Sequence, residues 1–167
     1  MEKLRLTIEF EYYRSSDELS EAERELFRAA MDAAKNAYAP YSLYKVGAAV
    51  RLESGRIVTG NNQENVAYPS GLCAERVALF YASANYPDDH IVAIAIAANA
   101  VNFTIKDKVT PCGACRQVMK EAENQNKHTI RVIMQGENGA VYISNSVENL
   151  LPISFKANEL KKISNNS

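Results

Sequence analysis

Three cysteines in two distant segments place the strongest limit on how this sequence can fold. Cys73 begins the run Cys-Ala-Glu-Arg, and Cys112 and Cys115 belong to Pro-Cys-Gly-Ala-Cys-Arg. Three thiolates suit one zinc ion that keeps one coordination position free. Both segments stand at predicted helix starts, where unpaired backbone N–H groups favour the thiolate form. A fold that uses these ligands must bring two helix N-termini side by side.

The sequence also indicates a compartment in which thiols stay reduced. The first five residues alternate in charge and lack the apolar stretch of a signal peptide. No apolar run reaches the roughly 18 residues that a membrane helix needs. We therefore expect a cytoplasmic protein without a membrane partner. In such a protein, cysteine pairs bind metal or take part in chemistry more often than they form disulfides.

The net charge and the length of the chain limit the kinds of partner and the number of domains that we expect. A net charge of −1 leaves no basic excess to neutralise phosphates, so nucleic acid is not an expected partner. A hydrophobic fraction of 47% with 23% charged residues is typical of a globular protein. No linker-like stretch or repeat divides the sequence. We predict a single domain over residues 1–167.

Two patterns near the start of the chain predict a strand and a helix. Apolar and polar residues alternate over residues 3–13, which predicts an N-terminal strand with one buried face. Ser20 and Glu23 form a capping box that opens a helix, which should run to about Tyr38 before Pro40 ends it. The helix should bury a single stripe, made of Leu26, Phe27, Ala30, Met31, Ala34 and Tyr38.

The remaining pattern predicts the fold class. Strands are expected at 44–52, 56–60, 91–98, 130–134 and 140–143, and helices at 73–85 and from Pro111 onward. Ile91 to Ala98 is continuously apolar, as in a strand covered on both faces. We expect an α/β fold, a three-layer α/β/α sandwich with a mixed central sheet of about five strands, to which residues 3–13 add an extension.

The cysteine motifs can be interpreted in more than one way. A structural zinc site is normally closed by four protein ligands, and neither His90 nor His128 stands in a ligand-spaced motif. An open, catalytic position is therefore preferred to a closed one. Glu75 would carry protons beside that position. Arg76 either hydrogen-bonds a ligand sulfur or forms a surface ion pair, and the sequence favours neither.

The order Cys73, Glu75, then Pro111-Cys112-x-x-Cys115 matches the signature of the zinc deaminases. The chain resembles the small homotetrameric cytidine deaminases of pyrimidine salvage, and the resemblance covers about residues 22–160. It extends to three further segments, which are Tyr41 to Ala49, Asn62 to Asn65, and Leu150-Leu151-Pro152 followed by Phe155. The resemblance implies one Zn²⁺ per subunit, a nucleoside substrate, and active sites shared between the subunits of a homotetramer.

The resemblance also implies roles for single residues. Asn62 and Glu64 should hydrogen-bond the ribose 3′-hydroxyl, and the Ala74 N–H should meet the base carbonyl O2. Tyr44 stands where the family has a phenylalanine against the base, and Phe155 should reach a neighbouring subunit's active site. Tyr68 either lines the ribose pocket or packs. With zinc activating water and Glu75 exchanging protons, the expected reaction converts cytidine or deoxycytidine to uridine or deoxyuridine and ammonia.

Three other functions share part of these features. A nucleic-acid-editing deaminase uses the same zinc chemistry, but it should carry basic residues and aromatic platforms for flanking bases. A deaminase for a modified nucleoside, such as the blasticidin S type, has similar zinc motifs; the Asn62 and Glu64 pair favours plain cytidine. A non-catalytic, zinc-stabilised interaction module would need a fourth protein ligand and no pocket.

Overall fold

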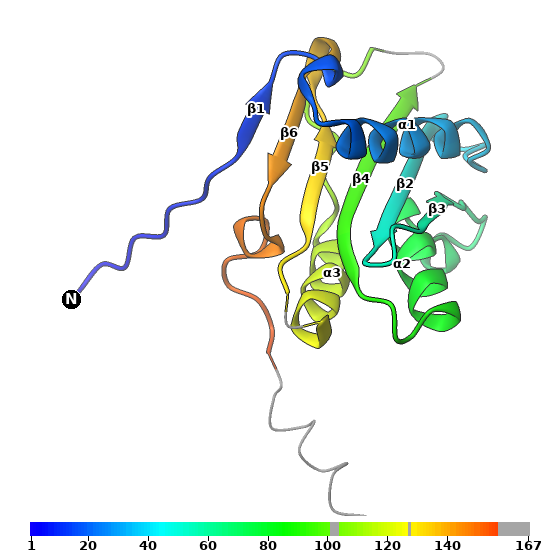
Figure 1. Ribbon diagram of the computed structural model, residues 1–167. Helices are drawn as coiled ribbons and strands as arrows, with labels where there is room; N and C mark the ends of the chain where they lie inside the picture. Colours follow the sequence, from blue (N-terminus) through cyan, green and yellow to red (C-terminus); the bar gives the residue numbers. More distant parts are fainter. Residues whose placement is uncertain (101–103, 127, 157–167) are drawn as a thin grey trace, which may run out of the picture.

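A six-stranded mixed sheet forms the centre of the protein in a computed structural model (Figure 1). The structure describes residues 1–100, 104–126 and 128–156. The strands are β1 (Glu11–Tyr13), β2 (Tyr44–Leu52), β3 (Ile57–Asn61), β4 (Ile91–Ala100), β5 (Arg131–Gln135) and β6 (Val141–Ser144), and the α-helices are α1 (Glu21–Lys35), α2 (Ala74–Asn85) and α3 (Gly113–Asn126). None of the helices in this part of the chain is long and apolar enough to cross a membrane.

The strands lie in the order β1-β6-β5-β4-β2-β3. Neighbouring strands are antiparallel except β4 and β5, whose parallel register pairs Ala93 with Arg131 and Ile96 with Met134. The pair is parallel because α3 carries the chain across one face of the sheet between them. The expected α/β sandwich with a mixed sheet is confirmed, and the N-terminal strand brings the number of strands to six.

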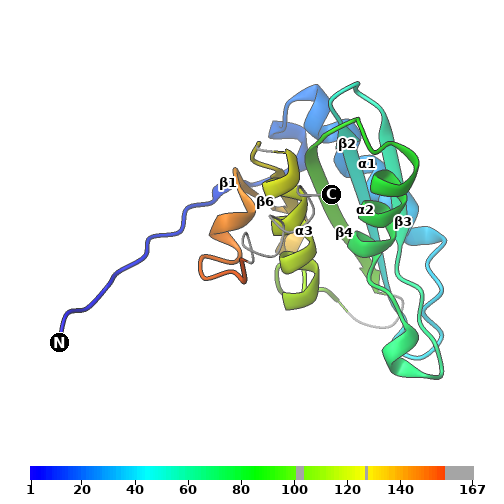
Figure 2. The same ribbon diagram turned by 90° about the horizontal axis from the view of Figure 1, so that it is seen from below.

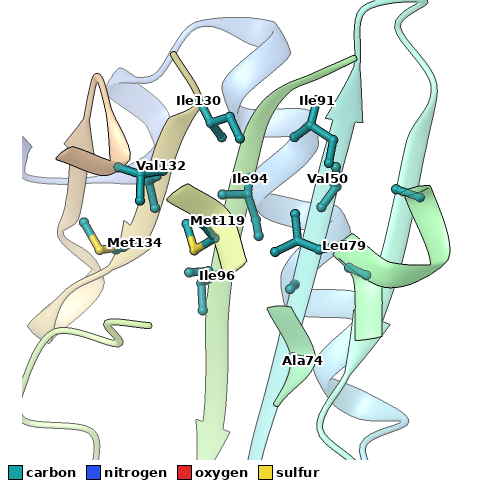
Figure 3. Packing of buried hydrophobic residues seen from close by; sticks show 14 of the residues in the cluster. Val50, Ala74, Leu79, Ile91, Ile94, Ile96, Met119, Ile130, Val132 and Met134 are labelled. Atoms are coloured by element: carbon teal, nitrogen blue, oxygen red, sulfur yellow. The ribbon is translucent and has the colours of Figure 1, made fainter. Parts of the chain in front are cut away.

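One face of the sheet is covered by α2 and α3. Ile94 and Ile96 of β4 pack there with Leu79 of α2 and Met119 of α3, all with at most 1% of their surface exposed (Figure 3). Burying side chains of this size stabilises the fold by about 1.5–3 kcal/mol each. This cluster therefore fixes the two helices whose first turns carry the cysteines.

The opposite face is covered by α1 and is built from smaller side chains. Ala49 of β2 and Ala95 and Ala97 of β4 pack with Phe27 and Ala30 of α1. Successive residues of β4 thus contribute to opposite clusters, as the continuously apolar run over residues 91–98 predicts. Short side chains let α1 lie close to the sheet.

Two glycines allow helices to approach the sheet at backbone contact. A Cβ on Gly47 of β2 would lie 2.0 Å from the Ala30 carbonyl oxygen of α1. A Cβ on Gly60 of β3 would lie 2.5 Å from the Ala78 nitrogen and 2.8 Å from the Ala74 carbonyl oxygen of α2. Gly60 is therefore needed to seat the first turns of α2, which carry the candidate site.

The N-terminal strand is much shorter than the predicted range of residues 3–13. Only Glu11–Tyr13 forms a strand, paired with β6 from Val141 to Ile143. Leu4, Leu6 and Ile8 are exposed rather than buried. The prediction fails because β6 ends at Ser144, so none of the described strands lies beside the residues that precede Phe10.

The predicted stripe of α1 is also partly wrong. Leu26, Phe27, Ala30 and Ala34 are buried, but Met31 is 47% exposed and Tyr38 is 55% exposed. Tyr38 lies beyond the end of α1 at Lys35. Its backbone instead exchanges hydrogen bonds with the loop after β3, because Tyr38 N donates to Asn62 O and Glu64 N donates to Tyr38 O. The capping box of Ser20 and Glu23 is confirmed.

Candidate metal centre and active site

The three cysteine sulfurs lie together where α2 and α3 begin. Cys112 Sγ is 3.8 Å from Cys73 Sγ and 3.4 Å from Cys115 Sγ, and all three sulfurs lie within 4.8 Å of one another. Tetrahedral zinc with Zn–S bonds of about 2.3 Å separates two sulfurs by about 3.8 Å. The donor set and its spacing therefore fit zinc. Within the described ranges, neither histidine joins this group of candidate ligands.

Helix geometry explains why the cysteines meet. Cys73 is the N-cap of α2, and its carbonyl accepts the first helical hydrogen bond from Val77 N. Cys112 stands just before α3, and its carbonyl accepts from Arg116 N. Cys115 follows in the first turn of α3 and is fully buried. All three thiols thus lie at the positive ends of helix dipoles.

The thiol groups of the cluster do not lose their protons equally easily. The pKa of Cys73 is lowered to about 5, first by a hydrogen bond from Cys115 and, despite partial burial, further by the Arg76 guanidinium. The same hydrogen bond, with burial, raises the pKa of Cys115. The cluster therefore already favours one thiolate, and zinc would require the other two sulfurs to lose their protons.

Arg76 lies beside the cluster. Its Nη2 is 3.8 Å from Cys73 Sγ, and its Nε is buried without a hydrogen-bond partner. Arg76 takes part in none of the ion pairs that connect the described residues. This placement supports the interpretation that Arg76 stabilises a ligand sulfur, and it does not support the alternative of a surface ion pair.

Glu75 is a buried carboxyl group next to the thiols. It occupies the first turn of α2 and is only 4% exposed. Burial is the main cause that raises its pKa, and the negative charge of Cys73 raises it further. A carboxyl whose pKa moves toward neutrality can both take up and release a proton.

A cavity of about 350 Å³ opens at this point. Its lining includes Cys73, Ala74, Glu75 and Cys112 from the helix starts. The other polar residues of the wall are Ser42, Tyr44, Asn62, Glu64, Lys108 and Thr110. The pKa of Tyr44 is raised by burial and by the charge of Glu75, and both residues line the cavity. The thiol cluster thus borders a space of the size of a small-ligand pocket.

Asn62 and Glu64 reach the cavity with side chains that are already fixed. Asn62 Oδ1 accepts from Val46 N at 2.8 Å, and its Nδ2 donates to Tyr44 O at 3.0 Å. The Glu64 carboxylate accepts from the Tyr41 N–H at 2.9 Å. Each group retains a lone pair or N–H, because an amide and a carboxylate have more hydrogen-bonding sites than these contacts use.

Ser42 connects Glu64 to the loop that carries Tyr44. Its hydroxyl donates to Glu64 Oε1 and accepts from Tyr44 N. Between them, Leu43 has a φ of 57°, a left-handed conformation that is unfavourable for a residue of this kind. The hydrogen bonds of Ser42 hold this strained turn. The resemblance pointed to the segment around Ser42, but only the structure reveals this positioning role.

Two further candidate residues, Tyr68 and Phe155, lie outside the lining of this first cavity. A second hollow of about 610 Å³ shares Ser42, Asn62, Glu64 and Cys73 with the first, and Tyr68 lines it. Phe155 is 73% exposed and lines neither of these two hollows. Its carbonyl accepts from Gln117 Nε2 of α3, so α3 holds the tail.

Arg116 is a further connection to the tail that the sequence does not reveal. Its Nε donates to Pro111 O at 2.8 Å, and its Nη1 donates to Leu150 O at 3.0 Å. One side chain therefore links the segment before Cys112 to the C-terminal turn. The two acceptors lie 39 residues apart in the chain, so their proximity has no local sequence pattern.

A family model provides an independent finding. Residues 20–139 match the model described as the cytidine and deoxycytidylate deaminase zinc-binding region. This range contains the three cysteines, Glu75 and the loop with Asn62 and Glu64. The match covers most of the chain.

Similar whole proteins agree with the family model. The chain is 38% identical over 135 residues to a cytidine deaminase of Halalkalibacterium halodurans, covering 81% of this chain and 95% of that protein. It is 37% identical over 128 residues to one of Sporosarcina psychrophila, covering 77% and 87%. The crystal structure of cytidine deaminase from Burkholderia pseudomallei superposes with a TM-score of 0.68 at 40% identity, covering 78% and 97%.

Proposed function

The chain belongs to the cytidine and deoxycytidylate deaminase family, and from that premise we propose how its residues deaminate a nucleoside. The reaction is zinc-dependent hydrolysis of cytidine and 2′-deoxycytidine to uridine and 2′-deoxyuridine, with release of ammonia. One observation supports this function most directly: the cluster of three thiols, through Cys73 and Cys112, borders the same cavity as the buried Glu75. The similarity to cytidine deaminases does not favour a modified-nucleoside deaminase or a non-catalytic zinc module.

Cys73, Cys112 and Cys115 would hold the zinc ion. When bound, zinc supplies the Lewis acidity that activates a water molecule near neutral pH. Three thiolates give the site a net negative charge, which weakens that acidity. The helix N-termini and Arg76 offset part of this charge, because each places positive potential near a sulfur.

Glu75 would be the proton carrier. It takes a proton from the attacking water and delivers it to N3 of the cytosine ring, which makes C4 electrophilic. The water oxygen bonds to C4, and Glu75 then takes the remaining proton from this oxygen and delivers it to the amino group. The C4–N bond breaks, ammonia leaves, and the oxygen becomes the C4 carbonyl of the uracil ring. One carboxyl can serve as base and acid in turn because burial raises its pKa toward the working range.

The base would be held by the start of α2 and by Tyr44. Ala74 is the first residue of α2, so its N–H has no acceptor within the helix and is available to the base carbonyl O2. The Tyr44 ring lines the cavity and would lie against the base. These contacts orient C4 toward the reacting groups.

The ribose would be held by Asn62 and Glu64. Their remaining hydrogen-bonding sites would meet the 3′-hydroxyl, while Ser42 and the backbone of β2 keep the two side chains in place. Groups that are fixed before the substrate arrives lose little freedom on binding. Contacts remote from the reacting atom in this way contribute orientation.

We also propose a homotetramer in which Phe155 completes a neighbour's active site. Its exposed ring follows a tail that Arg116 and Gln117 hold against α3. Phe80 and Tyr81 on α2 are 48% and 52% exposed, which suits a helix covered by another subunit. The chain would act as a single domain in the cytoplasm, in pyrimidine salvage.

A substrate panel tests the function. The zinc-loaded protein is incubated with cytidine, deoxycytidine, their monophosphates and blasticidin S, and ammonia release is measured. Cytidine and deoxycytidine should be deaminated fastest. Faster release from blasticidin S would replace the proposed substrate. Absence of ammonia from every compound, with zinc bound, would indicate a non-catalytic zinc module.

A further inference from the structure

The N-terminal arm, defined as residues 3–10, leads away from the body of the protein in both views (Figures 1 and 2). Its apolar side chains remain in solvent: Leu4 is 88% exposed, Leu6 51%, Ile8 50% and Phe10 40%. The arm also precedes residues 20–139, which match the deaminase family model. The proposed reaction therefore gives the arm no role.

The residues of the arm alternate as they do in a strand. Leu4, Leu6, Ile8 and Phe10 would share one face, and Lys3, Arg5, Thr7 and Glu9 the other. A strand of this kind needs a neighbour for its backbone and a surface for its apolar face. None of the strands in the described part of the chain supplies such a neighbour to the arm before Phe10.

The arm continues past the point at which the neighbouring strand of the sheet ends. β1 is an edge strand whose partner, β6, ends at Ser144. The chain then turns into the short helical segment Val147–Asn149. Beside the arm, the Asn149 side chain donates to the Glu9 carbonyl in place of a strand backbone. The arm is thus anchored at one end and continues past the sheet.

The sequence of the arm is complementary to itself in one arrangement. If two arms pair antiparallel about Thr7, each Arg5 lies opposite Glu9 of the other copy, and each Lys3 lies opposite Glu11. Leu4 then faces Phe10. Opposite charges across a strand pair stabilise it, and like charges destabilise it.

Other arrangements lose this match. Parallel, in-register pairing places Arg5 beside Arg5 and Glu9 beside Glu9. An antiparallel shift of two residues leaves only Lys3 with Glu9 or Arg5 with Glu11 as an opposite-charge pair. A shift of one residue turns the apolar face of one arm against the polar face of the other. The best register is therefore the symmetric one.

We propose that the N-terminal arm joins two copies of this chain through an antiparallel strand pair centred on Thr7. The interface is isologous, because the same segment serves both copies. It buries the apolar face that the single chain leaves in water and extends the strand that begins at the sheet edge in β1. This contact is separate from the one proposed for Phe155.

A cysteine at the symmetry centre tests the pairing. In the proposed register the two Thr7 residues face each other, with Cα atoms about 4.5–5.5 Å apart, within the range that a disulfide spans. The zinc-loaded, full-length Thr7→Cys variant should form a cross-linked dimer under mild oxidation on a non-reducing gel. Wild type gives the background from the native cysteines.

Lys3→Cys is the matched control. In the same register the two Lys3 positions lie eight residues apart along the pair, about 27 Å, which no disulfide can span. The control should stay at the wild-type background. If Thr7→Cys gives no more dimer than Lys3→Cys, the symmetric pair is wrong. Such a result would mean that the arm binds elsewhere or only collides at random.

Charge variants in the Thr7→Cys background test the register. Adding Arg5→Glu turns two opposite-charge pairs into two like-charge pairs, so the dimer yield at limiting concentration should fall by about tenfold. Adding Glu9→Arg as well restores opposite charges and should restore the yield. An unchanged yield with Arg5→Glu, or no recovery with Glu9→Arg, would overturn the proposal. The gel readout does not depend on deaminase activity.

Discussion

Two buried glutamates on the same face of the sheet have opposite surroundings. Glu75 on α2 and Glu123 on α3 are 4% and 5% exposed. Glu123 Oε1 accepts from Ile130 N, Val147 N and Ser146 Oγ, and Oε2 accepts from Lys120 Nζ at 2.9 Å. Glu75 instead borders the cavity and the thiols, and burial raises its pKa.

The difference separates a structural carboxylate from the one that we propose to be reactive. The donors around Glu123 hold its charge and connect α3 to the segments that begin at Ile130 and Val147. A buried carboxylate of this kind contributes to folding. Glu75 is less fully stabilised as an anion, so it can exchange a proton with a substrate in the cavity. Substitutions at the two sites should therefore affect different measurements.

The largest effect is expected at the metal itself. Cys112→Ala removes one of the three proposed ligands, whose sulfur lies 3.8 Å and 3.4 Å from the other two, so the protein should lose both zinc and cytidine deamination. Metal analysis and ammonia release on the same sample measure the two losses. A full complement of zinc in this variant would contradict the ligand assignment.

The second-largest effect on turnover is expected for Glu75→Gln. It keeps the shape of the side chain but removes the proton carrier, so turnover should fall by roughly two to four orders of magnitude while zinc remains bound. Glu123→Gln is the matched control and should retain turnover within a few fold. Near-normal turnover by Glu75→Gln would remove Glu75 from its proposed role.

The comparison should reverse when stability is measured. Glu123→Gln puts a neutral amide beside the buried Lys120, which keeps only the exposed Glu148 carboxylate at 3.6 Å, and breaking a buried pair costs up to about 3–5 kcal/mol in the free energy of unfolding. Glu75→Gln should cost far less, since it removes a charge that burial opposes. Urea unfolding of both variants measures this. Equal losses would mean that the two carboxylates are equivalent.

Ser42→Ala should have a smaller, kinetic effect. Removing its hydroxyl frees Glu64 and the Leu43 turn, and one lost hydrogen bond of about 1 kcal/mol corresponds to a several-fold higher KM for cytidine. Ser54→Ala is the control, because Ser54 makes a similar contact with Asp89 away from the cavity. An effect on kcat alone, or the same KM change in both variants, would contradict the positioning role.

Glu11 in β1 is a third glutamate to compare, and its partly exposed carboxylate pairs with Arg131. Hydrogen bonds from Arg131 lower the pKa of Glu11 from 4.5 to about 2. Its carboxylate therefore stabilises the fold above pH 4.5, and this contribution is lost as the pH falls toward 2. Glu11→Gln should flatten the pH dependence of the unfolding midpoint in that window, whereas exposed Glu2→Gln should not. An unchanged slope would show that the Arg131 contact adds nothing.

Local patterns in the sequence were sufficient for most of the fold. The capping box, the apolar run of β4 and the two helix starts depend on neighbours within a few residues, and the structure has each of them. The alternation over residues 3–13 predicts too long a strand, because alternation indicates a strand but not whether a neighbour exists. The apolar stripe predicts that Met31 is buried, but the face of α1 that contacts the sheet is narrower than this stripe.

In the candidate site, too, local sequence patterns predict some features and miss others. The cysteine spacing predicts that the sulfurs meet, and they do. The contacts of Glu123 could not be predicted, because its partners at Ile130, Ser146 and Val147 are brought together only by the packed sheet. The strained turn at Leu43 likewise depends on Glu64, which lies 21 residues further along the chain.

A zinc titration of the metal-free protein tests the central claim most directly. Ammonia release from cytidine should be absent without metal, rise in proportion to added zinc, and reach its plateau at one ion per chain, as three thiols in one cluster require. Zinc-loaded Glu75→Gln should bind the same single ion without that gain. Full turnover by the metal-free protein would contradict the account. So would a filled site that never releases ammonia from cytidine.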